Sequence, residues 1–152
     1  LIANDAIEMF LLIQDNSAED SLRVALQAYA KADLQLYQNK KEEALQLFLA
    51  ILQKHKGESI EEGTLFKVGK IYEEKGDFNK ALTYYQNILD NHKDGIYKDE
   101  ALYFSAEIYR KHLLDNEKAK VLYEKVVLEH PDSLYYTESR KQYRTLRGDS
   151  TI

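Results

Sequence analysis

The stretch from Thr64 to His92 has the most regular alternation of apolar and polar positions in the chain. Apolar or small residues in its first half recur three and four positions apart, the period of one helix face: Leu65, Val68, Gly69 and Tyr72. The second half continues with Ala81, Leu82, Tyr85 and Ile88. Between the halves, Gly76 can adopt the left-handed conformation that ends a helix, and Asp77 can cap the next helix. The pattern predicts two amphipathic helices joined by a tight turn.

This pattern recurs on both sides of the stretch with a period of 37 or 38 residues. Three positions keep the register: the small residues Ala32, Gly69 and Ala106; the small residues Ala44, Ala81 and Ala119; and the aromatic residues Phe48, Tyr85 and Tyr123. Their agreement over two periods indicates an array of helical repeats. We expect the extra residue of the last copy between its two helices, in Lys111–Asn116, because a loop absorbs one residue at little entropic cost.

The stretch from Thr64 to His92 resembles the tetratricopeptide repeat, a helix–turn–helix unit of about 34 residues with the pattern W-x2-L-G-x2-Y…A-x3-F…P. The matching positions are Leu65-x2-Val68-Gly69-x2-Tyr72…Ala81-x3-Tyr85…Lys93. The last copy, Leu102-x2-Ser105-Ala106-x2-Tyr109…Ala119-x3-Tyr123…Pro131, also keeps the proline of the family. The resemblance implies an all-α fold, a right-handed α-solenoid of antiparallel helix pairs with about eight helices.

We predict one helical-repeat domain over residues 1–152, with repeats at about 25–58, 62–95 and 99–133. A long helix is expected over about 19–38, an N-terminal helix over 3–14 and a closing helix over 133–146. The closing helix has a polar exposed face, as the last helix of a solenoid needs for solubility. The N-terminal helix is apolar around much of its circumference. This predicts that the chain is the C-terminal part of a longer protein with further repeats before Leu1, or that the helix mediates self-association.

The period of 37 residues exceeds the usual repeat length because extra residues lie between repeats, at Lys56–Glu61 and Lys93–Lys98. Lengthened repeats with segments such as His130-Pro131-Asp132-Ser133 resemble those of bacterial envelope proteins, namely the periplasmic Tol–Pal coordinator family and the outer-membrane-assembly lipoproteins. The ending Glu138-Ser139-Arg140-Lys141-x2-Arg144-x2-Arg147-Gly148 is similar to the terminal helix of that group. The resemblance implies a periplasmic or outer-membrane-associated location rather than a cytoplasmic one.

The composition argues against several classes of function. The chain has no cysteine, so disulfides, thiolate metal sites and cysteine nucleophiles are excluded. Its net charge of -5 argues against general nucleic-acid binding, which needs clustered Lys and Arg. The longest apolar run, Met9–Ile13, is far too short to span a bilayer, so we expect no direct membrane insertion.

Residues that could carry catalysis or bind a metal do not converge in this sequence. His55, His92 and His130 occupy the same place in each repeat, where packing at a helix end is expected. Equivalent positions in a solenoid lie about one repeat apart, so these histidines cannot form a metal site together. The sequence has no HExxH, no G-x-S-x-G and no glycine-rich phosphate loop. We therefore expect no enzyme activity, no cofactor and no metal.

The first helix of each repeat, which lines the concave groove in the family that the chain resembles, carries the candidate partner-binding residues. Aromatic residues stand 37 positions apart at Tyr29, Phe66 and Tyr103. Charged residues follow one turn later at Asp33, Lys70 and Glu107, and then at Glu73 and Arg110. Aromatic anchors beside charges are typical of a peptide-binding surface. The alternative is that the three aromatic rings pack between adjacent repeats.

The sequence favours a non-enzymatic scaffold that binds a peptide or protein in this groove. The best-known peptide-binding version of this family, the carboxylate clamp for chaperone tails, needs Lys, Asn and Arg at these groove places. Here the residues are mainly aromatic and acidic, so such tails are not the expected ligand. One alternative is a component of bacterial cell-envelope or outer-membrane assembly, and another is the docking or regulatory region of a larger enzyme. The basic residues Arg140, Lys141, Arg144 and Arg147 either balance a helix end or contact an acidic partner or anionic lipid.

Overall fold

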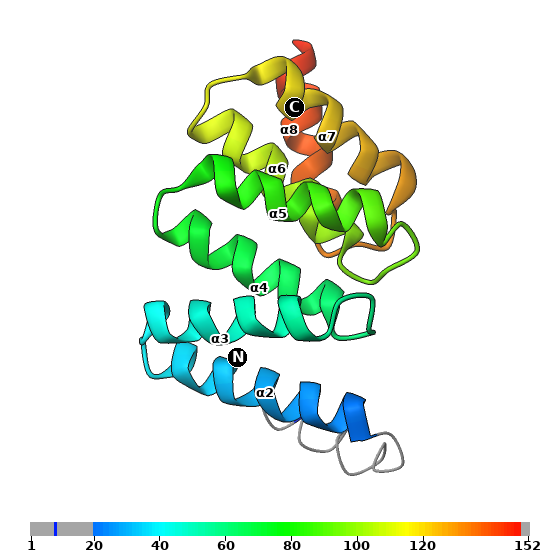
Figure 1. Cartoon of the computed structure of the whole chain (residues 1–152). Coiled ribbons are helices and arrows are strands. Elements are labelled where there is room, and N and C mark those ends of the chain that lie inside the picture. Colours follow the sequence, from blue (N-terminus) through cyan, green and yellow to red (C-terminus); the bar gives the residue numbers. More distant parts are fainter. Residues whose placement is uncertain (1–7, 9–19, 150–152) are drawn as a thin grey trace. The chain divides into compact units, whose positions relative to one another are not determined.

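The computed structural model describes residue 8 and residues 20–149, and apart from the single residue Glu8 its regular structure consists of seven α-helices. Figure 1 shows them as α2 (Asp20–Tyr37), α3 (Lys41–Lys54), α4 (Glu61–Glu74), α5 (Phe78–Asn91), α6 (Lys98–Lys111), α7 (Asn116–Glu129) and α8 (Tyr136–Arg147). The predicted all-α fold of repeat-type helix pairs is confirmed. The helix expected over 3–14 lies, apart from Glu8, outside the described residues.

The chain divides into two compact units, Leu1–Lys75 and Gly76–Ile152. In the first unit, α3 packs against both α2 and α4. In the second unit, α6 packs against α5 and α7, and α8 packs against α7. The helix pairs α2–α3 and α6–α7 are therefore formed as the repeat pattern requires. That the two units belong to a single domain stays a prediction.

The positions that keep the repeat register form the core of both units. The five alanines of the register have no exposed surface, and neither do the three aromatic residues: Ala32, Ala44, Ala81, Ala106, Ala119, Phe48, Tyr85 and Tyr123. Small side chains let two helix backbones approach, and the large rings then fill the space beside them. The interpretation of these residues as packing residues is confirmed.

The turns within repeats use one left-handed residue each. The links from α2 to α3 and from α4 to α5 have three residues, whereas the link from α6 to α7 has four, His112–Asp115. The extra residue of the last copy is therefore where the sequence predicted it. Asn39, Gly76 and Leu114 adopt φ angles of 60°, 80° and 53° at equivalent points of these turns.

Asp77 caps α5 as predicted, and Asp115 caps α7 in the same way. The carboxylate of Asp77 accepts a hydrogen bond from the Lys80 backbone N–H at 3.3 Å, and that of Asp115 accepts one from Lys118 at 3.1 Å. Each carboxylate satisfies an N–H group that has no partner within the helix. These caps fix the points where the second helices of the repeats begin.

The connections between repeats also share one geometry. His55, His92 and His130 are the C-cap residues of α3, α5 and α7, and six residues separate each of these helices from the next one. In each connection the carbonyl oxygen of the histidine accepts a hydrogen bond from the N–H three residues later, at 3.0 to 3.1 Å. The predicted helix-end role of the three histidines is confirmed, and the extra residues lie between repeats.

The closing helix begins three residues later than the predicted Ser133, because Ser133 forms a turn. Its hydroxyl accepts a hydrogen bond from the Tyr135 backbone N–H at 3.0 Å and donates one to Asp99 at 2.6 Å. Gly148, with a φ of 94°, ends α8 in the left-handed conformation. Among the described residues, no helix has the length and apolar character needed to cross a membrane.

Candidate protein-interaction site

The predicted groove residues of α2 are buried between helices of the first unit. Tyr29 is 2% exposed, and its ring meets the Phe48 ring edge-on, with ring centroids 5.4 Å apart. Asp33 has no exposed surface and pairs with the Lys67 ammonium of α4 at 3.1 Å. Both residues therefore contribute to packing between helices in this conformation, and their role in partner binding stays a prediction.

The predicted groove residues of α4 keep part of their surface accessible. Phe66 is half-buried. Lys70 and Glu73 form an ion pair at 3.6 Å, and their side chains retain 28% and 22% of their exposure. An aromatic ring beside two opposite charges, all partly exposed on one helix, can contact both apolar and charged groups of a partner.

In the second unit, α6 brings the remaining predicted residues together around one carboxylate. Glu107 accepts hydrogen bonds from the Tyr103 hydroxyl at 2.8 Å, the Tyr123 hydroxyl at 2.5 Å and the Arg110 guanidinium at 2.8 Å. The Lys111 ammonium lies 3.3 Å from the same carboxylate. Arg110 also donates to the Tyr123 hydroxyl at 3.0 Å. We call Tyr103, Glu107, Arg110 and Tyr123 the Glu107 network.

The Glu107 network shifts the ionisation of its members. Burial by itself would raise the pKa of Glu107, but hydrogen bonds from Tyr123, Tyr103 and Arg110 lower it to about 2. Burial raises the pKa of both tyrosines, and the neighbouring Glu107 carboxylate raises it further. The carboxylate is therefore ionised and the phenols are neutral at physiological pH. With its oxygens engaged by four donors, Glu107 is poorly placed to act as a proton acceptor for a substrate.

The Tyr103 ring packs against the segment that precedes α8. It stacks on the Tyr135 ring at a centroid distance of 4.4 Å and meets the Phe104 ring edge-on at 5.4 Å. The expectation that the aromatic residues pack between neighbouring repeats therefore describes Tyr103, which joins α6 to the connection after α7. Tyr103 nevertheless keeps partial exposure.

The sequence predicts that Tyr123 packs in the core, but no contact of its hydroxyl group was predicted. The signal was present, because the family pattern has phenylalanine at this position and a tyrosine adds a polar group that must find a partner when buried. Glu107 and Arg110, one turn apart on the facing helix, are the groups that satisfy it.

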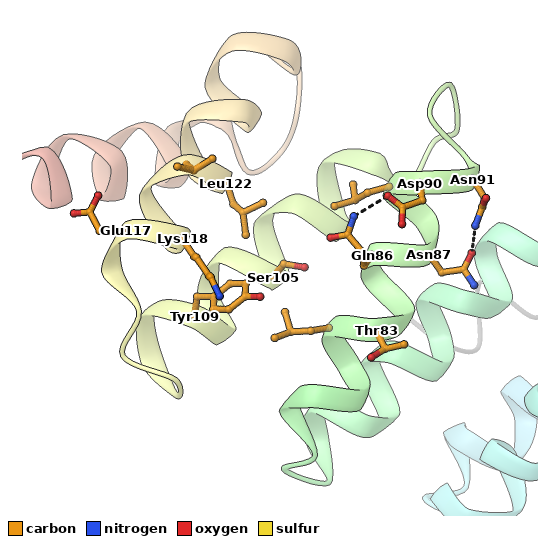
Figure 2. A pocket seen from close by; sticks show the side chains of 13 residues that line it. Thr83, Gln86, Asn87, Asp90, Asn91, Ser105, Tyr109, Glu117, Lys118 and Leu122 are labelled. Atoms are coloured by element: carbon orange, nitrogen blue, oxygen red, sulfur yellow. Dashed lines mark hydrogen bonds between the residues drawn. The ribbon is translucent and has the colours of Figure 1, made fainter.

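A groove that the sequence did not predict lies in the second unit between α5 and α7. Its volume is about 820 Å³. Figure 2 shows polar residues of α5 on one side and Lys118 and Leu122 of α7 on the other, with Tyr109 of α6 beside Lys118 and Ser105 of α6 between the two sides. Gln86 donates to Asp90 at 2.8 Å and Asn91 donates to Asn87 at 2.7 Å along the α5 side.

The described residues contain no cluster of three or more His, Cys, Asp or Glu side chains that could hold a metal ion. The three recurrent histidines are at helix ends, and His112, the fourth, is exposed and stacks on the Phe78 ring at 3.9 Å.

Comparison with known families supports the sequence resemblance over part of the chain. The family model described as tetratricopeptide repeat matches residues 64–95 and 100–133. These two segments are similar to tetratricopeptide repeats. They correspond to α4 with α5 and to α6 with α7, and the α2–α3 pair has the same buried register without being matched. No curated protein matches the chain. Tetratricopeptide repeats are in general protein–protein interaction modules, and the family is non-enzymatic.

Proposed function

We propose that this protein is a non-enzymatic scaffold that binds a protein or peptide through the first helices of its repeats. The observation that carries the proposal is the difference in burial between two sets of positions within the two matched repeats. The family positions that hold the helices together, such as Val68, Ala81 and Tyr85, are buried, although Tyr72 and Tyr109 keep partial exposure. Phe66, Lys70 and Glu73, at positions the family leaves unspecified, also keep partial exposure. A partly exposed residue at a position that the family pattern leaves unspecified can contact a partner.

The contact surface on α4 consists of Phe66, Lys70 and Glu73, and α6 offers the partly exposed Arg110. The Arg110 side chain retains 26% of its exposure beside the Glu107 network. Tyr29 and Asp33 support the surface from within the first unit, and Tyr103 and Glu107 do so within the second. A partner with apolar side chains and both signs of charge fits these groups.

The experiment that tests the proposal is affinity capture with a Phe66→Ala/Lys70→Glu variant. Both residues are partly exposed, so the variant should fold, which circular dichroism would verify. The matched control is Lys80→Glu on α5, where the side chain is 61% exposed and lies outside the proposed surface. Partners should be lost from the first variant and kept by the control. Equal retention of every partner by both variants would reject the proposal.

We further propose that the scaffold acts in assembly of the bacterial cell envelope, in the periplasm or at the outer membrane. The support is the set of three connections between repeats, each six residues long with a histidine at its start, which lengthen the repeat as in the envelope proteins that the sequence resembles. Fractionation of source cells into cytoplasm, periplasm and membranes tests this location. Recovery in the cytoplasm alone would contradict it.

A docking or regulatory region of a larger enzyme is the remaining alternative. The interaction surface would be the same, and only the rest of the natural polypeptide would differ. Mass spectrometry of a digest of the natural protein distinguishes a scaffold from a region of a larger enzyme. A catalytic domain would add peptides with catalytic motifs to those of residues 1–152.

A further inference from the structure

The groove between α5 and α7 takes no part in the function proposed above. Leu82 and Leu89 of α5 and Val121 and Leu122 of α7 line it, and Val121 is 51% exposed. The core faces of the same helices are fully buried at Ile88 and Val126. Both helices therefore carry a second apolar surface that the described part of the second unit leaves uncovered, and covering it would remove apolar area from water.

One end of the groove carries three lysines and two carboxylates. It continues into a smaller cavity of about 230 Å³ that shares Gln86, Leu89, Asp90 and Leu122 with it and adds Lys93, Lys98, Lys125 and Glu129. Lys98 pairs with Glu129 at 3.1 Å. Lys93 and Lys125 make no ion pair within the part of the chain that the structure describes. An occupant with apolar side chains and carboxylates would complement both parts of the groove.

The segment of residues 3–14 has this chemistry. It contains two carboxylates, at Asp5 and Glu8, and no Lys, Arg or His. The helix that the sequence predicts over 3–14 would be roughly 18 Å long, and α5 and α7 with their 14 residues each are about 21 Å long. Apolar residues would surround much of this predicted helix, so it would need cover on two sides.

We propose that the groove between α5 and α7 binds residues 3–14 of a second copy of this chain. Phe10 and Leu11 of the second copy would contact Val121 and Leu122, and its carboxylates would face Lys93 and Lys125. A reciprocal exchange of segments produces a closed two-fold dimer, whereas a one-way exchange produces open chains. This inference concerns α5 and α7 and does not depend on the partner-binding surface of α4 and α6.

Sedimentation velocity of the full chain over a range of concentrations tests the self-association. The wild-type chain should associate reversibly. Val121→Asp should weaken the association by about tenfold or more, because a charge replaces apolar contact area worth more than one decade in affinity. Leu128→Asp is the matched control, since Leu128 is 71% exposed on the same helix and does not line the groove. A monomeric wild-type chain, or equal weakening by both variants, would overturn the proposal.

Charge reversal tests the orientation of the segment. Lys93→Glu/Lys125→Glu should weaken association, and adding Asp5→Lys/Glu8→Lys to the same chain should restore it. Because all four positions would carry reversed charges, restoration separates a direct contact from a loss of folding. If the chain with all four reversed charges associates no more tightly than Lys93→Glu/Lys125→Glu alone, the proposed contact is contradicted.

Cross-linking identifies the occupant, because the chain contains no cysteine. A Leu11→Cys chain mixed with a Val121→Cys chain should form a disulfide-linked dimer on oxidation, and Leu128→Cys in place of Val121→Cys should not. If the Leu11→Cys/Val121→Cys double variant instead forms only a disulfide within one chain, the occupant is the segment of the same molecule and the proposal fails. A chain that stays monomeric but binds an added acidic apolar peptide in the groove would also overturn it.

Discussion

The Tyr123 hydroxyl of α7 lies 2.5 Å from Oε2 of Glu107 on α6, and this hydrogen bond joins the two helices of the last repeat. Tyr123→Phe removes the donor and leaves a partly buried carboxylate with one fewer hydrogen bond. We expect a loss of about 2 kcal/mol in the free energy of unfolding, since hydrogen bonds to charged groups contribute roughly 1.5–3 kcal/mol. Urea unfolding of both proteins measures the difference, and an unchanged midpoint would show that the bond is not stabilising.

The pKa of Glu107 predicts how stability depends on acid. Its folded-state pKa of about 2 is below the value of 4.5 expected in the unfolded chain. The ionised network therefore stabilises the fold fully above pH 4.5, and this contribution is lost as the pH falls toward 2. Glu107→Gln should be less stable than the wild type at pH 7. The difference in unfolding free energy between the two proteins should decrease as the pH falls from 4.5 toward 2.

The control for this pH dependence is Glu117→Gln, because the Glu117 side chain is 82% exposed. Its unfolding free energy should follow the wild-type curve within about 0.5 kcal/mol at every pH. Chemical denaturation at a series of pH values measures all three proteins. A gap between wild type and Glu107→Gln that stays constant from pH 7 to pH 2 would contradict the network account.

The ion pair of Asp33 and Lys67 should behave as a buried pair. Asp33→Ala removes the carboxylate that faces the Lys67 ammonium, so we expect a loss of about 3 kcal/mol. Asp33→Leu/Lys67→Met should recover most of this loss, because an apolar pair carries no desolvation cost. Glu74→Ala breaks the exposed pair with Lys41 and should cost under about 1 kcal/mol. Thermal unfolding distinguishes these outcomes, and equal losses for Asp33→Ala and Glu74→Ala would contradict the assignment.

Leu114 has a φ of 53°, in the left-handed region that disfavours a side chain. Its side chain is 78% exposed, so little packing is lost on its removal. Leu114→Gly should therefore keep the stability of the wild type or raise it by up to about 1 kcal/mol. Leu134→Gly is the matched control in another loop, because Leu134 is 94% exposed without a positive φ and should lose stability slightly. Equal losses in thermal unfolding for both variants would contradict the strain at Leu114.

The repeat architecture could be predicted from the sequence because its signal is periodic. Ala32, Ala44 and Phe48 keep the register of the matched repeats, and this register located the α2–α3 pair although only the small residues and the aromatic ring survive there. The turn residues Gly76 and Asp77 act locally, so their roles also follow from neighbouring sequence. Burial at a helix interface repeats along the chain, and a periodic pattern reveals it.

The functional surface could be predicted less well because equivalent positions have different neighbours. Tyr29, Phe66 and Tyr103 share one register, yet Tyr29 is buried against Phe48 and Tyr103 stacks on Tyr135. Phe48 belongs to the repeat register, but the stacking of Tyr103 on Tyr135 depends on a residue outside that register. The groove between α5 and α7 was not predicted either. In the sequence Val121 is an apolar residue of an amphipathic helix like many others, and only the structure shows that its side chain is exposed.

The central claim, that the first helices of the repeats bind a protein partner, is tested most directly by hydrogen exchange of the chain with and without a captured partner. Bound partner should slow amide exchange in Glu61–Glu74 and Lys98–Lys111, and the Phe66→Ala/Lys70→Glu variant should lose the protection. Protection confined to the second helices, Phe78–Asn91 and Asn116–Glu129, with none in the first helices, would contradict the account.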